Sequence, residues 1–270
     1  MKKSLELTPG HGEMLKPKEL LELHGAGPLT LQDRRVFNEL VQNAWGPQLG
    51  QAGNWFEIDT GRLRDATDRN TRLALSVERL MRTICTVVSD DGARELRTAL
   101  LSSNEITTTA NGGILRYKFT EELAAMLKDS TIFAKLDLEV MRSFSSKYAY
   151  SLYEAVSRRV RMKRFTETFS ISELRELLGV EDGKLMIYKN LKVRAIQPAL
   201  TEVNAITPYQ VSIVPQKKGR KVVSFIMGWN LKDEPGMQEA YREMQRPRVG
   251  RKSRIEGQDE QPVIDNGMGT

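Results

Sequence analysis

The chain has 270 residues, a formal net charge of +6, 28% charged residues and 40% hydrophobic residues. This composition is ordinary for a globular protein, and the length suits two domains of about 100 residues with tails. The single cysteine, Cys85, excludes an internal disulfide, and its apolar neighbours predict a buried thiol. No apolar run approaches the ~18 residues that cross a bilayer, and no signal-peptide core is present, so we expect a cytoplasmic protein without a membrane partner.

The N-terminal half predicts a helical domain behind a flexible start. Residues 1–28 mix Lys, Glu, Gly and Pro without a sustained hydrophobic period, which predicts a flexible N-terminal arm. From Thr30, which can cap a helix with Asp33 in its first turn, apolar residues recur at helical spacing as far as Gly46. A short strand, WFEID, and a short helix, TGRLRDA, follow.

A longer helix is expected in the segment NTRLALSVERLMRTI, residues 70–84. Its predicted buried face is Leu73, Val77, Leu80, Met81 and Ile84, and its predicted outward face is Arg72, Leu75, Arg79 and Arg82. ELRTALLSSNEIT and GGILRYKFT then form an expected hairpin, and EELAAML an expected closing helix. The order of these elements predicts an N-terminal winged helix at residues 29–135.

The same order of elements recurs about 110 residues further along the chain. SSKYAYSLYEAVSRRVR predicts a helix capped by Ser145, and TFSISELRELLGV a short helix capped by Ser170 or Ser172 and ended by Gly179. IYKNLKVRAIQPALTEVN is the candidate recognition helix, and YQVSIVP and KVVSFIMGW are strands joined by the cationic turn QKKGR. These parts predict a C-terminal winged helix at residues 136–232.

The whole chain is therefore expected to be α+β, with two tandem winged-helix domains, each a helix-turn-helix plus a β-hairpin wing, and disordered termini. The apolar junction FAKLDLEVMRSF predicts domains that are docked together rather than tethered. Residues 233–270 are polar, with basic residues followed by acids, and predict a disordered tail.

A longer basic helix beside a cationic hairpin has the shape that enters a DNA major groove while its wing lies on the backbone. We expect double-stranded DNA as partner. On the recognition helix, the outward residues whose chemistry suits base edges are Asn190, Val193, Arg194 and Gln197. Predicted phosphate contacts are Lys189, Lys192, Lys217, Lys218, Arg220 and Lys221, with Arg158, Arg159 and Arg161 as a second basic run. A merely solvated face is the alternative, and Pro198 predicts a bend in the helix.

Four blocks, SSKYAYSLYEAV, ISELRELLGV, YKNLKVRAIQPALTEVN and KKGRKVVSFIMGW, resemble the C-terminal winged helix of the iteron-binding plasmid replication initiators, the Rep3 family. The resemblance implies monomers that bind origin repeats, dimers that repress the gene's own promoter, and recruitment of host initiator and helicase proteins. It also implies that Arg72, Leu75, Arg79 and Arg82 contact the DNA backbone or a second subunit. The sequence departs from the family at Val193, where another basic residue is expected.

Enzymatic functions are disfavoured, and we expect no metal or cofactor. The two histidines, His11 and His24, both lie in the predicted arm, which leaves a tyrosine nickase without a metal-ligand set. No GxxxxGK[ST] loop is present to cradle a nucleoside triphosphate. Two non-enzymatic alternatives stay open, namely a winged-helix transcriptional regulator without a replication role and a module that binds acidic protein partners.

Overall fold

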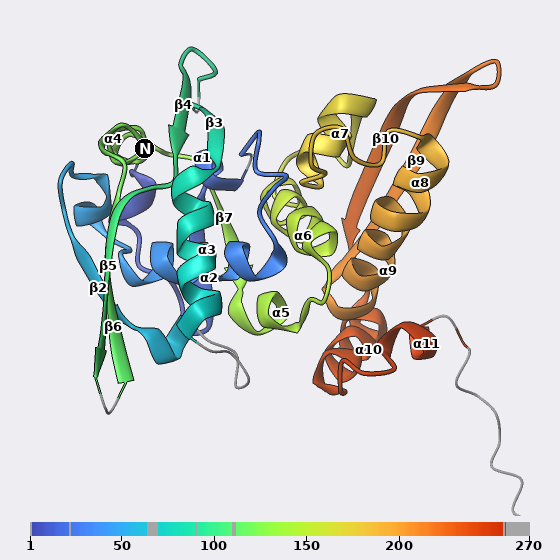
Figure 1. Cartoon of the computed structure of the whole chain (residues 1–270). Helices are drawn as coiled ribbons and strands as arrows, with labels where there is room; N and C mark the ends of the chain where they lie inside the picture. The colour runs from blue at the N-terminus through green and yellow to red at the C-terminus, as the bar shows by residue number, and fades with distance from the viewer. Residues whose placement is uncertain are drawn as a thin grey trace, which may run out of the picture.

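The computed structural model describes residues 2–21, 23–63, 70–89, 91–109, 112–255 and 257. Two units lie side by side, each with helices packed on a three-stranded antiparallel sheet, and helix α6 (Lys147–Arg159) contacts both (Figure 1). This is the predicted α+β arrangement of tandem winged helices. Within the described residues, no helix is both long and apolar enough to cross a membrane.

The N-terminal unit follows the order of a winged helix. Its elements are α2 (Leu31–Asn43), β2 (Phe56–Asp59), a 3₁₀ helix (Thr60–Leu63), α3 (Asn70–Arg82), β5 (Leu101–Thr109) and β6 (Gly112–Phe119), with the sheet in the order β2-β6-β5. Thr30 and Asp33 form a capping box at the start of α2, as their spacing predicts. Leu73, Val77 and Leu80 fill the core from the predicted face of α3.

The predicted end of the long helix, at Ile84, is wrong. α3 ends at Arg82, and Ile84 begins β3 (Ile84–Val88), which pairs with β4 (Glu95–Ala99). The Ile84 side chain is 58% exposed instead of lying on the buried helix face. The run ICTVV is rich in β-branched residues, which favour an extended chain, and this preference outweighs the helical spacing of Ile84.

The flexible arm predicted for residues 1–28 is wrong for the described part of that segment. A 3₁₀ turn (Ser4–Glu6), β1 (Glu13–Pro17) and α1 (Lys18–Leu21) form there, and β1 pairs antiparallel with β7 (Phe133–Asp137). Buried side chains from this segment are Leu5, Met14, Leu15 and Leu20. The strand is completed by a partner far away in the sequence, so local hydrophobic spacing gives no sign of it.

The C-terminal unit begins with α6 and repeats the order of the first. Its other elements are β8 (Thr166–Ser170), α7 (Ile171–Leu177), α8 (Tyr188–Leu191), a π-helical segment (Lys192–Ile196), α9 (Gln197–Ile206), β9 (Tyr209–Lys218) and β10 (Lys221–Leu231), with the sheet in the order β8-β10-β9. Ser170 and Glu173 form a capping box, and Gly179 turns the chain with φ +68°. Ser146, rather than the predicted Ser145, caps α6 by accepting from the Tyr148 amide.

The tail prediction is wrong for residues 233–255, while residues 258–270 lie outside the described part of the chain. Asp233 caps α10 (Glu234–Gln245), which packs on α9, and α11 (Arg251–Ile255) follows. Arg251 lies within ion-pair distance of Glu202 on α9 and Glu243 on α10, at 3.6 Å from each. Polar composition predicted disorder here, but the charges pair with one another across the helices.

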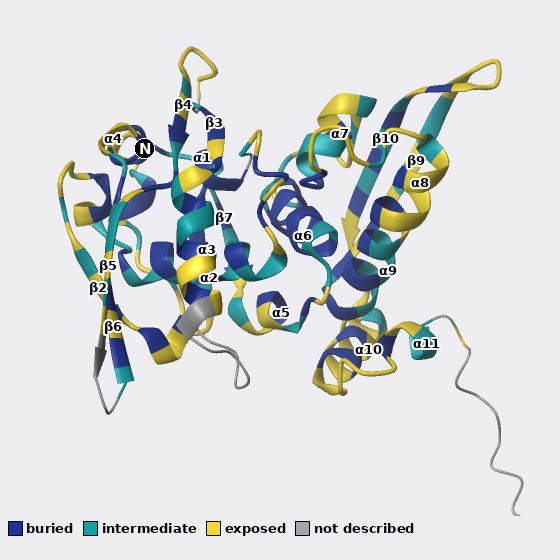
Figure 2. Ribbon diagram, viewed as in Figure 1, coloured by how far each residue is buried: buried dark blue, intermediate teal, exposed yellow. Residues whose placement is uncertain are grey.

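The two units are docked, as the apolar junction predicts. α4 (Glu121–Lys128), β7 and α5 (Leu138–Ser143) lead directly into α6, whose side chains are almost all buried (Figure 2). Lys147 on α6 donates to the Gly27 carbonyl at 2.6 Å, and the Gly25 amide donates to Glu176 on α7 at 3.1 Å. A Cβ on Gly27 would lie 2.6 Å from the Glu181 Cα, so the units touch through backbone.

Candidate DNA-binding surface

The recognition helix runs continuously through α8, the π-helical segment and α9. Its inner face packs Leu191, Ala195, Ala199 and Val203 into the core, as predicted. The six residues proposed for DNA contact on this helix are all exposed: Lys189, Asn190, Lys192, Val193, Arg194 and Gln197. An amphipathic helix whose free face holds three cations and two amides has the chemistry to meet base edges and phosphates.

Pro198 is accommodated by a widened turn just before it. The Gln197 amide donates to the Lys192 carbonyl, five residues back, which defines the π-helical segment. Ala195 and Ile196, at the end of this segment, are both buried. Lys192, Val193 and Arg194 are exposed in succession, so the outward face carries three neighbouring side chains at its centre.

The wing is a two-stranded ribbon of β9 and β10 that extends past the body of the unit, at the same end as the start of α8 (Figure 1). Gly219 takes φ +63° at the tip, a left-handed conformation that suits glycine. The four predicted cations around it are exposed: Lys217, Lys218, Arg220 and Lys221. A cationic tip beside the recognition helix is the arrangement in which a wing follows the phosphate backbone.

The three arginines of the second basic run, Arg158, Arg159 and Arg161, differ in exposure. Arg161 is exposed and Arg158 is half-buried, whereas the Arg159 side chain is only 5% exposed. Arg159 donates from Nε to Glu167 at 2.7 Å and from Nη1 to the Ala155 carbonyl, so its predicted phosphate contact is wrong and it instead ties α6 to β8. Its position seven residues after the buried Leu152 places it on the inner face of α6, a signal present in the sequence.

The N-terminal unit presents a weaker version of the same surface. Arg72 and Arg82 are exposed, and Arg82 pairs with Glu78 at 2.8 Å. Leu75 is 46% exposed on the same helix. Arg79, predicted to point outward for DNA or a second subunit, donates two hydrogen bonds to the buried carboxylate of Asp33, at 2.7 and 2.8 Å, and so joins α3 to α2.

The Asp33 carboxylate stabilises the contact between α2 and α3. Burial by itself raises the pKa of the Asp33 carboxyl, but the bonds from Arg79, Ser76 and Thr30 outweigh burial and hold the pKa below its usual range. The carboxylate thus caps α2 and neutralises Arg79 at once. Cys85, by contrast, is an inert core residue as predicted, because burial raises the pKa of its thiol to about 12.

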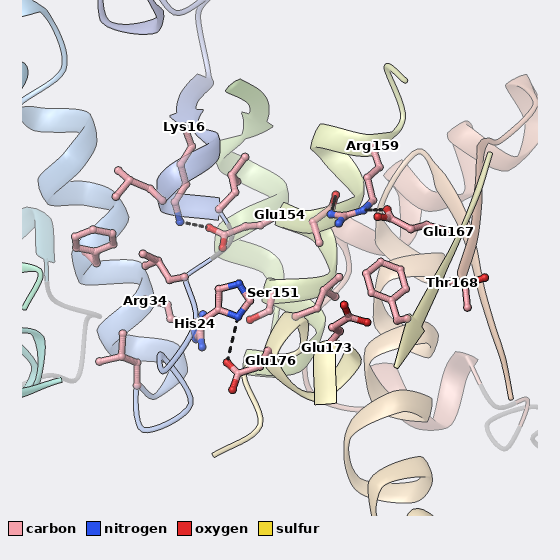
Figure 3. A pocket seen from close by; sticks show the side chains of 18 residues that line it. Lys16, His24, Arg34, Ser151, Glu154, Arg159, Glu167, Thr168, Glu173 and Glu176 are labelled. Atoms are coloured by element: carbon pink, nitrogen blue, oxygen red, sulfur yellow. Dashed lines mark hydrogen bonds and ion pairs between the residues drawn. The ribbon is translucent and has the colours of Figure 1, made fainter. Parts of the chain in front are cut away.

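A cavity of about 240 Å³ lies between the two units (Figure 3). Lys16 of β1 pairs across it with Glu154 of α6 at 2.7 Å, and both side chains are 4% exposed. Burial lowers the pKa of Lys16, opposed by the adjacent Glu154. The His24 imidazole lies 3.9 Å from Glu176 on the same boundary. Among the described residues, no group of three or more His, Cys, Asp or Glu side chains is arranged to hold a metal ion.

Two winged helices in one chain, one with an exposed polar recognition face and a cationic wing, define a DNA-binding protein of the tandem winged-helix class. The profile described as "Initiator Replication protein, WH1" (Rep3_N) matches residues 14–157, and "Initiator Rep protein, WH2" (Rep3_C) matches residues 170–229. The chain belongs to the Rep3 family of replication initiator proteins. The first profile begins inside the predicted arm and runs through most of α6.

A solved structure of similar fold is the Pi initiator protein in complex with iteron DNA. The TM-score is 0.56 at 20% sequence identity, over 83% of this chain and 98% of that chain. No curated protein sequence was found to match the chain. The likeness to Pi therefore supports the fold, and the family profiles support membership among the initiators.

Proposed function

We propose that this protein initiates replication of a plasmid by binding iteron repeats in double-stranded origin DNA and promoting local opening of the duplex. The observation on which this rests is the exposed face of α8–α9, with a cationic wing at the same end of the unit, in a chain of the initiator family. The Pi protein, which has a similar fold, binds iteron DNA.

In this proposal the C-terminal unit reads sequence. Arg194 can donate two bonds to guanine O6 and N7, Gln197 or Asn190 can pair with adenine N6 and N7, and Val193 can meet a thymine methyl. The cations of the helix and the wing hold the phosphates. With six to ten phosphate contacts, affinity falls about 10³- to 10⁵-fold between 50 and 200 mM salt.

The N-terminal unit would bind the adjoining groove. In the view of Figure 1, α3 begins at the lower end of the molecule and α8 at the upper end, so the two recognition helices run in opposite directions. Two recognition helices held in one chain can enter successive major grooves of one duplex. Arg72 and Arg82 are then placed for the backbone, while Leu75 is available to a second copy of the chain.

The remaining parts of the proposal follow from the family. The protein acts in the bacterial cytoplasm by binding, without catalysis or a cofactor, and dimers repress its own promoter. Host initiator and helicase proteins are its expected protein partners. The absence of a phosphate-cradling GxxxxGK[ST] loop from the sequence supports an initiator that does not hydrolyse nucleotide.

The test is selection of random duplex DNA by the purified protein at about 150 mM salt, a concentration at which non-specific binding is weak. Recovery of one site that occurs as head-to-tail repeats in the source replicon supports the proposal. On a supercoiled plasmid bearing these repeats, the protein should also make nearby thymines reactive to permanganate. An inverted repeat alone would indicate a transcriptional regulator, and no enriched sequence would refute base readout.

A further inference from the structure

Two large apolar side chains stand exposed directly before the recognition helix. Met186 is 71% exposed and Ile187 is 67% exposed, and neither residue was singled out by sequence reasoning. Ile187 is the N-cap residue of α8 and makes no side-chain capping bond. Isoleucine is among the poorest N-cap residues, and exposed apolar surface adds nothing to folding, so the pair has no evident structural purpose.

The backbone around this pair is held in an unusual conformation. Leu185 has φ +52°, the one non-glycine residue with a positive φ among the described residues. Its side chain packs against the core, and its carbonyl accepts a 2.9 Å hydrogen bond from Nη1 of Arg175 on α7. Nη2 of Arg175 donates to the Lys184 carbonyl. The left-handed turn at Leu185 is thus fixed from α7, and the chain that follows it presents Met186 and Ile187 to solvent.

The residues that follow Met186 and Ile187 are also held in place by packing. Tyr188 packs on Phe225 of β10, with ring centroids 6.0 Å apart, and Leu191 is buried. Lys184, Lys189 and Lys192 are exposed around the pair, while the acids Glu181 and Asp182 precede the turn at Gly183. An apolar pair set among lysines at the leading end of a recognition helix suits the major groove, whose apolar feature is the C5-methyl group of thymine.

We infer that Met186 and Ile187 read thymine methyl groups at the edge of the site contacted by Asn190 and Arg194. This inference rests on the proposed function and extends the base-reading set beyond the helix into the α7–α8 turn. Val193 would read a separate methyl nearer the centre. Burial of one methyl group changes a binding constant about fourfold.

The test compares duplexes of the selected site in which each thymine is replaced singly by deoxyuridine, which lacks the methyl. The wild-type protein should bind about fourfold more weakly when a contacted methyl is removed. The Met186→Ala/Ile187→Ala variant should bind the normal site more weakly and show no further loss at those positions. Val193→Ala should lose sensitivity at a different thymine, and Met237→Ala, an exposed methionine on α10, should behave as wild type.

Stability provides an independent readout. Ile187→Ser should unfold at the same or a higher urea concentration than wild type, because serine is a better N-cap, yet should bind the site more weakly. Indifference of the wild type to every deoxyuridine, or unchanged sensitivity in the double variant, would overturn the inference while leaving iteron binding intact. Loss of self-association with unchanged DNA binding would also overturn it. A wild-type protein that selects no site would refute the proposed function, and the inference with it.

Discussion

Replacing Lys16 by methionine removes one partner of the buried ion pair that joins β1 to α6. The two charges lie 2.7 Å apart with 4% of each side chain exposed, so solvent cannot screen the loss. Asn38 still donates to the Glu154 carboxylate at 2.8 Å, but a buried anion without its cation costs about 3–5 kcal/mol of unfolding free energy. Lys16→Met should therefore be strongly destabilising even though methionine fills a similar volume.

A double-mutant cycle isolates the charge. Glu154→Gln keeps the shape and an oxygen for Asn38, so Lys16→Met/Glu154→Gln should be at least about 2 kcal/mol more stable than Lys16→Met alone. The control is Lys135→Met, which removes an ion pair to Glu13 between the neighbouring strands β1 and β7, with side chains 40% and 37% exposed. This change should cost at most about 1 kcal/mol. Urea unfolding followed by circular dichroism measures the wild type, the two single variants and the double variant of the cycle, and the Lys135→Met control. Equal losses for Lys16→Met and Lys135→Met would refute the reasoning.

Three further predictions concern the other buried charges and the DNA face. Asp33→Asn should lower the free energy of unfolding by about 2–3 kcal/mol at pH 7. Because the folded pKa of Asp33 is lowered, the difference in stability from wild type should persist above about pH 4 and vanish as the pH falls through the folded pKa. A difference in urea midpoint that does not change with pH would contradict this. In a fluorescence titration, Arg194→Ala should weaken binding to the selected site by about 1–3 kcal/mol with little effect on binding to random DNA. Lys218→Ala should weaken binding to the selected site and to random DNA by similar factors. If Arg194→Ala also weakens binding to both DNAs equally, the assignment of base readout to Arg194 is wrong. Arg251→Ala should lower the unfolding free energy by about 2–4 kcal/mol, because Glu202 loses the buried cation beside it and the Ser143 carbonyl loses its donor. Lys252→Ala, its exposed neighbour, should change it by less than about 0.5 kcal/mol, and similar urea midpoints for both variants would contradict the packing of α11 against the C-terminal unit.

Sequence reasoning succeeded where short-range chemistry decides the structure. The cap at Thr30 with Asp33 in the first turn, the cap at Ser170, which is one of the two predicted positions, the turn at Gly179 and the buried stripe of the recognition helix all depend on residues within a few positions of one another. Each side chain proposed for DNA contact on that helix is exposed for the same reason. The repeated order of elements was sufficient to predict two winged helices.

Two of the failures depend on partners far away in the chain. The sequence of β1 has no strand pattern of its own, and its hydrogen bonds come from β7. The polar sequence of α11 predicts disorder, but Arg251 lies within ion-pair distance of Glu202 on the recognition helix. Arg159 sits in a run of cations, yet Glu167 and the packing of α6 draw it inside. The π-helical turn before Pro198 and the left-handed Leu185 are backbone solutions that side-chain periodicity does not encode.

We propose that the two docked winged helices act together on one duplex. Hydroxyl-radical footprinting of the intact protein on its selected site tests this most directly. Two protected DNA segments should appear about one helical turn, 10–10.5 base pairs, apart. In Arg194→Ala, protection of the segment contacted by the C-terminal unit should be the first to weaken. Protection confined to a single turn of DNA would contradict the account, because the N-terminal unit would then take no part in binding the site.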